Sequence, residues 1–236
     1  MKNEIIGEKV ILRPLREEDA EFFTYWYNTS EVMFQCGFHE PTLLENEIKR
    51  INRPEDSDED WYAVTDKNTG KLVGETGLLR IWSHWYCTDM SIIIPNPEDQ
   101  GKGYGSEATR LMLSRAFDHY SLNRVSIGVV ARNTPALAFY KKIGFKQEGI
   151  QEQGYFFNGE FSDFVMMRIL RSEYYFKEAT MLPQSLIEKG FSLTNVSSSD
   201  LHDFIRIIRL CLKKYIDENH SVFGEWNEEN ISSYRF

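Results

Sequence analysis

The chain has 236 residues, of which 42% are hydrophobic and 14% aromatic, and its formal net charge is −9 at pH 7. This charge argues against a nucleic acid or an anionic membrane surface as partner, and it suits a cationic substrate. No apolar run approaches the roughly 20 residues of a membrane span, and the first residues do not resemble a signal peptide. The 3 cysteines lack metal-ligand spacing, so we expect a cytoplasmic protein with reduced thiols and no metal site.

The first hundred residues predict alternating strands and helices. A strand is expected at 8–15, and an aromatic helix that contains Phe22, Phe23 and Trp26 follows it. A second helix is expected at 42–53, with a buried face formed by Leu43, Leu44, Ile48 and Ile51. Two strands joined by a turn at 68–70 are expected at 61–65 and 71–79, before a central strand at 89–94.

An acidic run lies between the second helix and the next strand. Residues 55–60 place 5 carboxylates in 6 positions. Such a run is either a solvated loop or a region of negative charge that attracts an amine.

The most informative stretch is residues 91–108. An apolar strand ends at Ile94, a proline-marked loop follows, and 3 glycines then fall within 5 residues. An amphipathic helix comes next, with one face formed by Leu111, Met112, Ala116, Phe117 and Tyr120. The first turn of a helix has free backbone N–H groups, and glycines let phosphate oxygens approach them. The stretch therefore predicts a phosphate-binding loop.

The spacing of this loop excludes two common phosphate-binding motifs. A Walker A loop requires Gly-x-x-x-x-Gly-Lys-Ser/Thr, whereas Lys102 here lies between two glycines. The dinucleotide fingerprint requires Gly-x-Gly-x-x-Gly, and the third glycine here comes one residue early. The remaining pattern is Gln-x-x-Gly-x-Gly, formed by Gln100, Gly103 and Gly105.

A second motif follows after a β-branched strand at 124–130. It reads Asn-x-x-Ala-x-x-x-Tyr-x-Lys-x-Gly-Phe and runs from Asn133 to Phe145. Asn133 can cap a helix that Gly144 ends. The two motifs, in this order, resemble the GNAT superfamily of acyl-CoA-dependent N-acyltransferases. Residues 12–15 resemble the opening of ribosomal-protein acetyltransferases, and residues 155–161 resemble those enzymes and spermidine acetyltransferases alike.

The resemblance implies a mixed α/β GNAT fold over residues 1–172, with a central seven-stranded sheet flanked by helices. A hairpin of strands 145–157 and 161–170 around Asn158-Gly159 completes it. We expect a linker at 173–189 and, at 190–236, a partial GNAT-like segment without a CoA motif. Because that segment buries too little surface alone, we expect it to dock on the first domain or on a second copy, forming a homo-oligomer.

The resemblance implies an acetyl-CoA-dependent N-acetyltransferase in which a primary amine attacks the thioester directly. The acceptor is left open among protein N-termini, polyamines, aminoglycosides and amino sugars. The alternative is a non-catalytic CoA-binding module whose C-terminal segment serves assembly. The predicted CoA-binding residues are Ile92, Ile93, Ile94, Gln100, Gly101, Lys102, Gly103, Tyr104, Gly105, Ser106, Asn133 and Tyr140.

Three residues are candidates for proton transfer. Tyr140 matches the family tyrosine near the sulfur, so it is the candidate general acid, although a purely aromatic core role is the alternative. Asp89 and Glu75 are candidate bases, because a carboxylate in an apolar site has a raised pKa. A chain of water molecules could replace both, and Asn133 could act as a helix cap alone.

Overall fold

The computed structural model describes residues 3–53 and 58–180 of the chain. The chain divides into two compact units, Met1–Glu173 and Tyr174–Phe236. The first unit carries both motifs. The predicted linker beyond residue 180 and the predicted partial domain at 190–236 lie outside the described residues.

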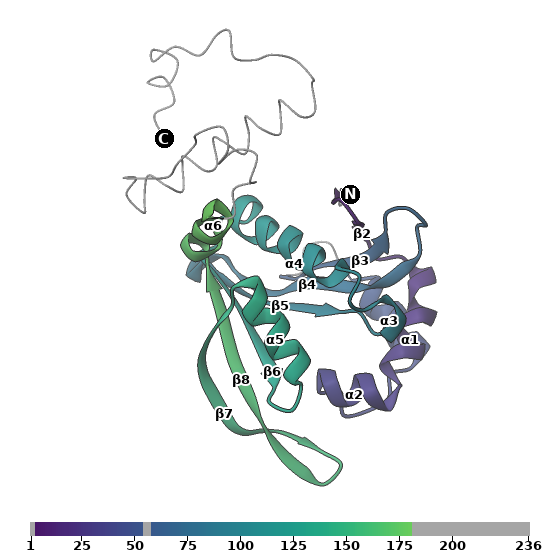
Figure 1. The fold of residues 1–236 in the computed structure, drawn as a ribbon. Coiled ribbons are helices and arrows are strands. Elements are labelled where there is room, and N and C mark those ends of the chain that lie inside the picture. The colour runs from purple at the N-terminus through teal and green to yellow at the C-terminus, as the bar shows by residue number, and fades with distance from the viewer. Residues whose placement is uncertain (1–2, 54–57, 181–236) are drawn as a thin grey trace, which may run out of the picture. The chain divides into compact units, whose positions relative to one another are not determined.

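The first unit is built on an eight-stranded mixed sheet with the order β1-β2-β3-β4-β5-β6-β8-β7 (Figure 1). Its strands are β1 (Ile5–Ile6), β2 (Val10–Pro14), β3 (Asp60–Asp66), β4 (Leu72–Trp82), β5 (Cys87–Ile93), β6 (Arg124–Val130), β7 (Lys146–Phe157) and β8 (Glu160–Leu170). The mixed α/β class is confirmed. The expected number of seven strands is wrong by one, because the two-residue strand β1 pairs with β2.

Six α-helices accompany the sheet in the described part of the chain. They are α1 (Ala20–Tyr27), α2 (Ser30–Cys36), α3 (Leu44–Ile51), α4 (Tyr104–Ser114), α5 (Thr134–Ile143) and α6 (Arg171–Thr180). Helix α4 continues into a π-helical turn at Arg115–His119. Helix α6 crosses the boundary between the two units. No helix among the described residues is long and apolar enough to cross a membrane.

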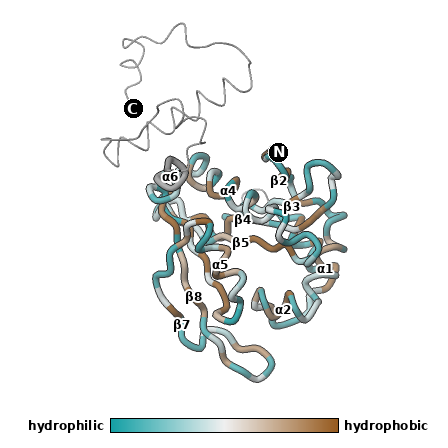
Figure 2. The backbone as a smooth tube through the Cα atoms, viewed as in Figure 1, coloured by the Kyte–Doolittle hydropathy of each residue, from teal (hydrophilic) through white to brown (hydrophobic). Residues whose placement is uncertain are grey.

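The two faces of the sheet are covered by different helices. Helix α4 packs on the face that carries Leu12, Tyr62 and Leu78, all fully buried. Helices α1 and α2 supply a second apolar cluster of Phe23, Tyr27 and Val32, against which Ile93 of β5 packs. Figure 2 shows hydrophobic colour along part of β5, whose sequence places the polar Thr88, Asp89 and Ser91 before the apolar end at Ile92 and Ile93.

One sequence-based expectation about the region before β3 is wrong, and another holds for only part of its residues. Leu43 and Leu44 are 64% and 40% exposed, because α3 begins only at Leu44 and turns Glu47 inward instead. The acidic run is not uniformly solvated, since Asp60 is fully buried at the start of β3 and forms an ion pair with Arg115. Residues 55–57 of the run lie outside the described ranges.

Helix α2 was not predicted from the sequence, although its end signals are present. The Thr29 side chain accepts a hydrogen bond from the Val32 backbone N–H at the start of the helix. Gly37 ends the helix in the left-handed conformation, with φ of 79°. This short helix matters because its C-terminal end lies beside the candidate site.

Candidate functional site

Strands β5 and β6 separate partway along their length. They pair in parallel only from Cys87 with Arg124 to Asp89 with Ser126. Beyond this point β5 continues to Ile93 against β4, while β6 continues to Val130 against β8. Figure 1 shows the two strands diverging, so backbone groups at the facing edges of both lack a strand partner there.

The glycine loop follows the open end of β5 directly. Gly101 and Gly103 have φ values of 73° and 93°, which residues other than glycine rarely adopt. Gly103 is the N-cap of the 11-residue helix α4, so the first backbone N–H groups of the helix point out of its end. The side chain of Gln100 donates to the carbonyl of Ile94 at 2.9 Å and holds the loop against the strand.

Lysines from separate parts of the chain surround this loop. Lys71 and Lys102 both reach the buried carboxylate of Asp99, at 2.7 and 3.3 Å. The Lys9 ammonium donates to the Lys102 carbonyl at 3.2 Å. Positive charge and exposed N–H groups therefore occur together.

The residues present fit a diphosphate group at this loop. A Cβ atom added to Gly103 would lie 3.1 Å from the Lys9 Nζ, so the space that the glycine leaves open faces an ammonium group. A Cβ at Gly101 would meet nothing within 4 Å. The phosphates of CoA would find both donors and charge here, with Tyr104, Gly105 and Ser106 supplying the first helical turn.

The second motif forms α5 as predicted. Asn133 Oδ1 accepts from the Ala136 backbone N–H at 3.1 Å, and Gly144 ends the helix with φ of 127°. Asn133 Nδ2 donates to the Gln35 carbonyl at 3.2 Å. The residue thus caps α5 and ties it to the end of α2; its contact with CoA stays a prediction.

Tyr140 lies in α5 and is 5% exposed. Its ring makes edge contacts with Phe139 and Phe145, at centroid distances of 4.9 and 5.5 Å. Burial raises the pKa of Tyr140, with a smaller contribution from the Cys36 thiol. The phenol is therefore protonated at neutral pH and can donate a proton or a hydrogen bond.

Glu75 is 2% exposed and belongs to a buried polar cluster. Its Oε1 accepts from the Tyr27 hydroxyl at 2.5 Å, and its Oε2 accepts from Arg50 at 2.9 Å. Arg50 also donates to Glu47 at 2.8 Å. Burial raises the pKa of Glu75, although Arg50 and Tyr27 both act to lower it. Each carboxylate oxygen of Glu75 is thus already held by a donor.

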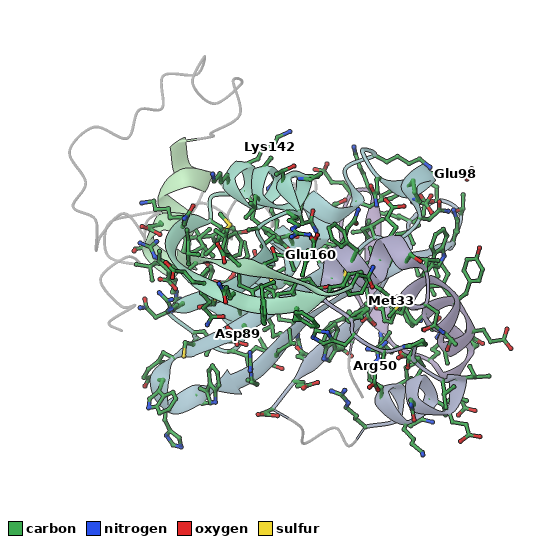
Figure 3. The ribbon with its side chains drawn as sticks, turned by 90° about the horizontal axis from the view of Figure 1, so that it is seen from below. Met33, Arg50, Asp89, Glu98, Lys142 and Glu160 are labelled. Atoms are coloured by element: carbon green, nitrogen blue, oxygen red, sulfur yellow. The ribbon has the colours of Figure 1, made fainter. Side chains whose placement is uncertain are left out.

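Asp89 lies at the other end of β5. In the pairing with β4, Glu75 faces Ile93 and Leu79 faces Asp89, so about 13 Å of strand separates the two positions. Figure 3 shows Asp89 well apart from Arg50, the partner of Glu75. Asp89 forms an ion pair with Arg80, whose side chain is 60% exposed. The two candidate bases are therefore not brought together.

The sequence analysis missed several residues that surround these candidates. They are Tyr27, Cys36, Arg50 and Tyr155. The pKa of Cys36 is raised to about 12, first by burial and then by Glu75, and the Cys36 thiol in turn acts on Tyr140 and Tyr155. No local pattern marks Tyr27, Cys36 and Arg50, which come from α1, α2 and α3. Tyr155 opens the stretch 155–161 that resembles acetyltransferases, but its place at the site was not predicted.

Comparisons with known proteins identify the family of the chain. The profile of the family described as "Acetyltransferase (GNAT) domain" matches residues 9–146. Spermidine N(1)-acetyltransferase of Vibrio cholerae serotype O1 is 28% identical over 171 residues, which cover 72% of this chain and 97% of that protein.

Two solved structures of the Vibrio cholerae spermidine N-acetyltransferase are also similar. The complex with CoA and spermine has a TM-score of 0.61 and 29% identity, covering 71% of this chain and 99% of that one. A dodecameric form has a TM-score of 0.60 and 27% identity, covering 71% and 97%. With its separated strands, its glycine loop and a family match over residues 9–146, the chain belongs to the GNAT family and is an N-acetyltransferase that transfers the acetyl group of acetyl-CoA to an amine.

Proposed function

We propose that the acceptor is a primary amine of an aliphatic polyamine, which attacks the thioester directly. The observation that carries this proposal is the similarity to spermidine N(1)-acetyltransferase across 97% of that protein. The net charge of −9 supports a polycationic substrate, because it raises the local concentration of cations. Protein N-termini, aminoglycosides and amino sugars are the competing acceptors.

The chain's own residues have distinct roles in this reaction. Acetyl-CoA supplies an activated acetyl group with a thiolate as leaving group. Residues 100–106 hold its diphosphate through backbone N–H groups, with Lys102 and Lys9 adding charge. Ile93 pairs with Glu75 of β4, so the backbone N–H groups that point toward the open edge and the thioester oxygen are those of Ile92 and of Ile94, just beyond the strand. A preorganised donor of this kind contributes about 3 kcal/mol as charge develops on that oxygen.

Different groups handle the proton that the leaving thiolate gains and the proton that the amine loses. Tyr140 donates to the departing thiolate, because its buried phenol is neutral at working pH. Glu75 orients Tyr27 and Arg50, and the donor already on each of its oxygens makes it a poorer acceptor for the amine proton than water. Asp89 is held by Arg80 at the paired end of β5. The amine proton therefore passes to water.

We also propose that the chain assembles with copies of itself. The support comes from the dodecameric form of the Vibrio cholerae enzyme. Light scattering on the purified protein checks it, and a monomer at every tested concentration would exclude it.

The acceptor proposal is tested with a panel of amines at fixed acetyl-CoA. Spermidine, an aminoglycoside and a peptide with a free N-terminus are compared by CoA release and by mass spectrometry of the product. We expect kcat/KM to be highest for spermidine. Turnover of the peptide alone would replace the polyamine with a protein N-terminus, and turnover of none of the amines would remove the proposal.

A further inference from the structure

The Tyr155 hydroxyl on β7 is a buried polar group without a partner. The residue is 4% exposed, and its oxygen has no hydrogen-bond partner among residues 3–53 and 58–180. A bulge in the pairing of β7 with β8, between Gln151 and Tyr155, precedes it. Bulges redirect side chains and are frequent next to active sites.

Aromatic rings pack around the Tyr155 ring. Tyr155 stacks on Phe157 at a centroid distance of 6.1 Å, with an interplanar angle of 11°. His39 and Phe164 lie at 5.5 and 5.8 Å. The ring also contacts the turn after α2, where a Cβ added to Gly37 would lie 3.5 Å from its edge. Aromatic faces of this kind attract alkylammonium groups by cation–π interactions.

The position of Tyr155 connects it to the reaction site. Gly37, which directly follows Cys36 at the end of α2, lies against the Tyr155 ring. Helix α2 is tied to α5 by the hydrogen bond from Asn133 to Gln35. Strand β7, through Tyr155, and helix α5, through its cap Asn133, thus both contact the same end of α2.

An unpartnered buried hydroxyl reduces the stability of a folded protein, because it has lost its hydrogen bonds to water. Phenylalanine would fill the same volume without this cost. The Tyr27 hydroxyl differs, since it donates a hydrogen bond to Glu75 within the protein. A hydroxyl that costs stability and serves no internal contact indicates a role toward a ligand.

We propose that the Tyr155 hydroxyl accepts a hydrogen bond from an ammonium or amine group of the bound polyamine. The aromatic rings of Tyr155, Phe157 and His39 form the walls of this binding site. This inference rests on the proposed function and names a substrate-binding residue for it. The hydroxyl accepts from the N–H group, and the rings stabilise the positive charge. Tyr155 therefore selects a cationic aliphatic amine.

The test compares Tyr155→Phe with the parent protein, with Tyr25→Phe as control. Tyr25 lies on α1 and is 67% exposed, so its hydroxyl is solvated. We expect Tyr155→Phe to raise the KM for spermidine by about tenfold, as for a lost hydrogen bond to a charged group. The KM for acetyl-CoA should not change. The melting temperature should stay the same or rise, whereas Tyr27→Phe should lower it.

The outcomes separate this inference from the function on which it rests. An active parent with an unchanged spermidine KM in Tyr155→Phe would overturn the inference alone. A lower melting temperature together with weaker acetyl-CoA binding would also overturn it, because that pattern marks a structural role. If the parent acetylates no amine, the proposed function fails and the Tyr155 role fails with it.

Discussion

At the residue scale, Tyr140 and Glu75 are both buried, but their surroundings suit different tasks. Tyr140 is flanked by Phe139 and Phe145, and its phenol stays neutral at working pH. Glu75 is enclosed by donors that fix its charge and its orientation. The phenol is therefore suited to transient proton donation, while the carboxylate is suited to holding α1 and α3 against the sheet.

Replacing Tyr140 by Phe should lower kcat by about two to three orders of magnitude, the usual contribution of a general acid. Acetyl-CoA affinity should remain close to that of the parent, since the phenol acts on the departing thiolate. Steady-state kinetics and calorimetric titration measure the two effects, and Tyr25→Phe serves as the control. If kcat and acetyl-CoA affinity fall by the same factor, or if neither changes, Tyr140 is not the general acid.

Replacing Arg50 by Met should reduce the free energy of unfolding by about 3–5 kcal/mol at neutral pH, because it leaves buried carboxylates unpaired. Without Arg50 the pKa of Glu75 rises further, so the folded state takes up a proton more readily than the unfolded state. The loss should therefore be smaller at pH 5 than at pH 8.

Urea unfolding at the two pH values measures this difference. Arg16→Met is the matched control, since Arg16 pairs with Glu18 at the surface with both side chains more than half exposed. Its effect should stay below about 1 kcal/mol. A loss for Arg50→Met that is the same at both pH values would contradict an ionised Glu75 as its cause.

The buried polar cluster of Tyr27, Arg50 and Glu75 is an example of side-chain contacts that the sequence alone does not predict. Glu75 lies 48 residues from Tyr27 and 25 from Arg50 in the sequence, and only the packing of α1 and α3 on β4 brings the three together. The helix cap at Asn133 and the end at Gly144 were predicted because their signals are local. Contacts between distant residues carry no such signal.

At the scale of elements, the strand, glycine loop and helix from β5 to α4 form one functional unit. Gly103→Val places a Cβ where Lys9 lies 3.1 Å away and forces a branched residue to φ of 93°. We expect acetyl-CoA affinity to fall by at least about tenfold, or roughly 1.4 kcal/mol. Calorimetric titration of the folded variant measures the loss.

Gly159→Val is the matched control for the glycine loop. Gly159 has φ of 83° and open space around its Cβ position at the tip of the β7–β8 hairpin. Both variants therefore carry similar backbone strain, but only Gly103→Val should weaken acetyl-CoA binding. Unchanged affinity in a folded Gly103→Val protein would place the diphosphate elsewhere.

Predictability also differs between elements. The hairpin turn at Asn158-Gly159 was predicted and has both residues at positive φ, 48° and 83°. The boundaries of β6 were predicted correctly because Val125, Ile127 and Val129 alternate along it with period two. Helix α2 was missed because its 7 residues give too few turns for a periodic pattern. The bulge in β7 was missed because it depends on pairing with β8.

At the scale of the whole molecule, both motifs lie in the unit Met1–Glu173. The full chain should therefore bind one acetyl-CoA per chain, and a chain ending at residue 180 should bind it with the same affinity. Calorimetric stoichiometry tests both statements. Two tight sites on the full chain would show that residues beyond 180 hold a second one.

The short parallel pairing of β5 with β6 has a consequence for how long the folded protein survives. Only three residue pairs between β5 and β6 join the two halves of the sheet in the described part of the chain. Cooperative unfolding of the two halves therefore depends in part on a ligand bound between the separated strands. Acetyl-CoA bound in the gap raises the free energy of unfolding by RT ln(1 + [L]/Kd), where [L] is the acetyl-CoA concentration. Resistance of the folded protein to proteolysis should therefore rise with the concentration of acetyl-CoA.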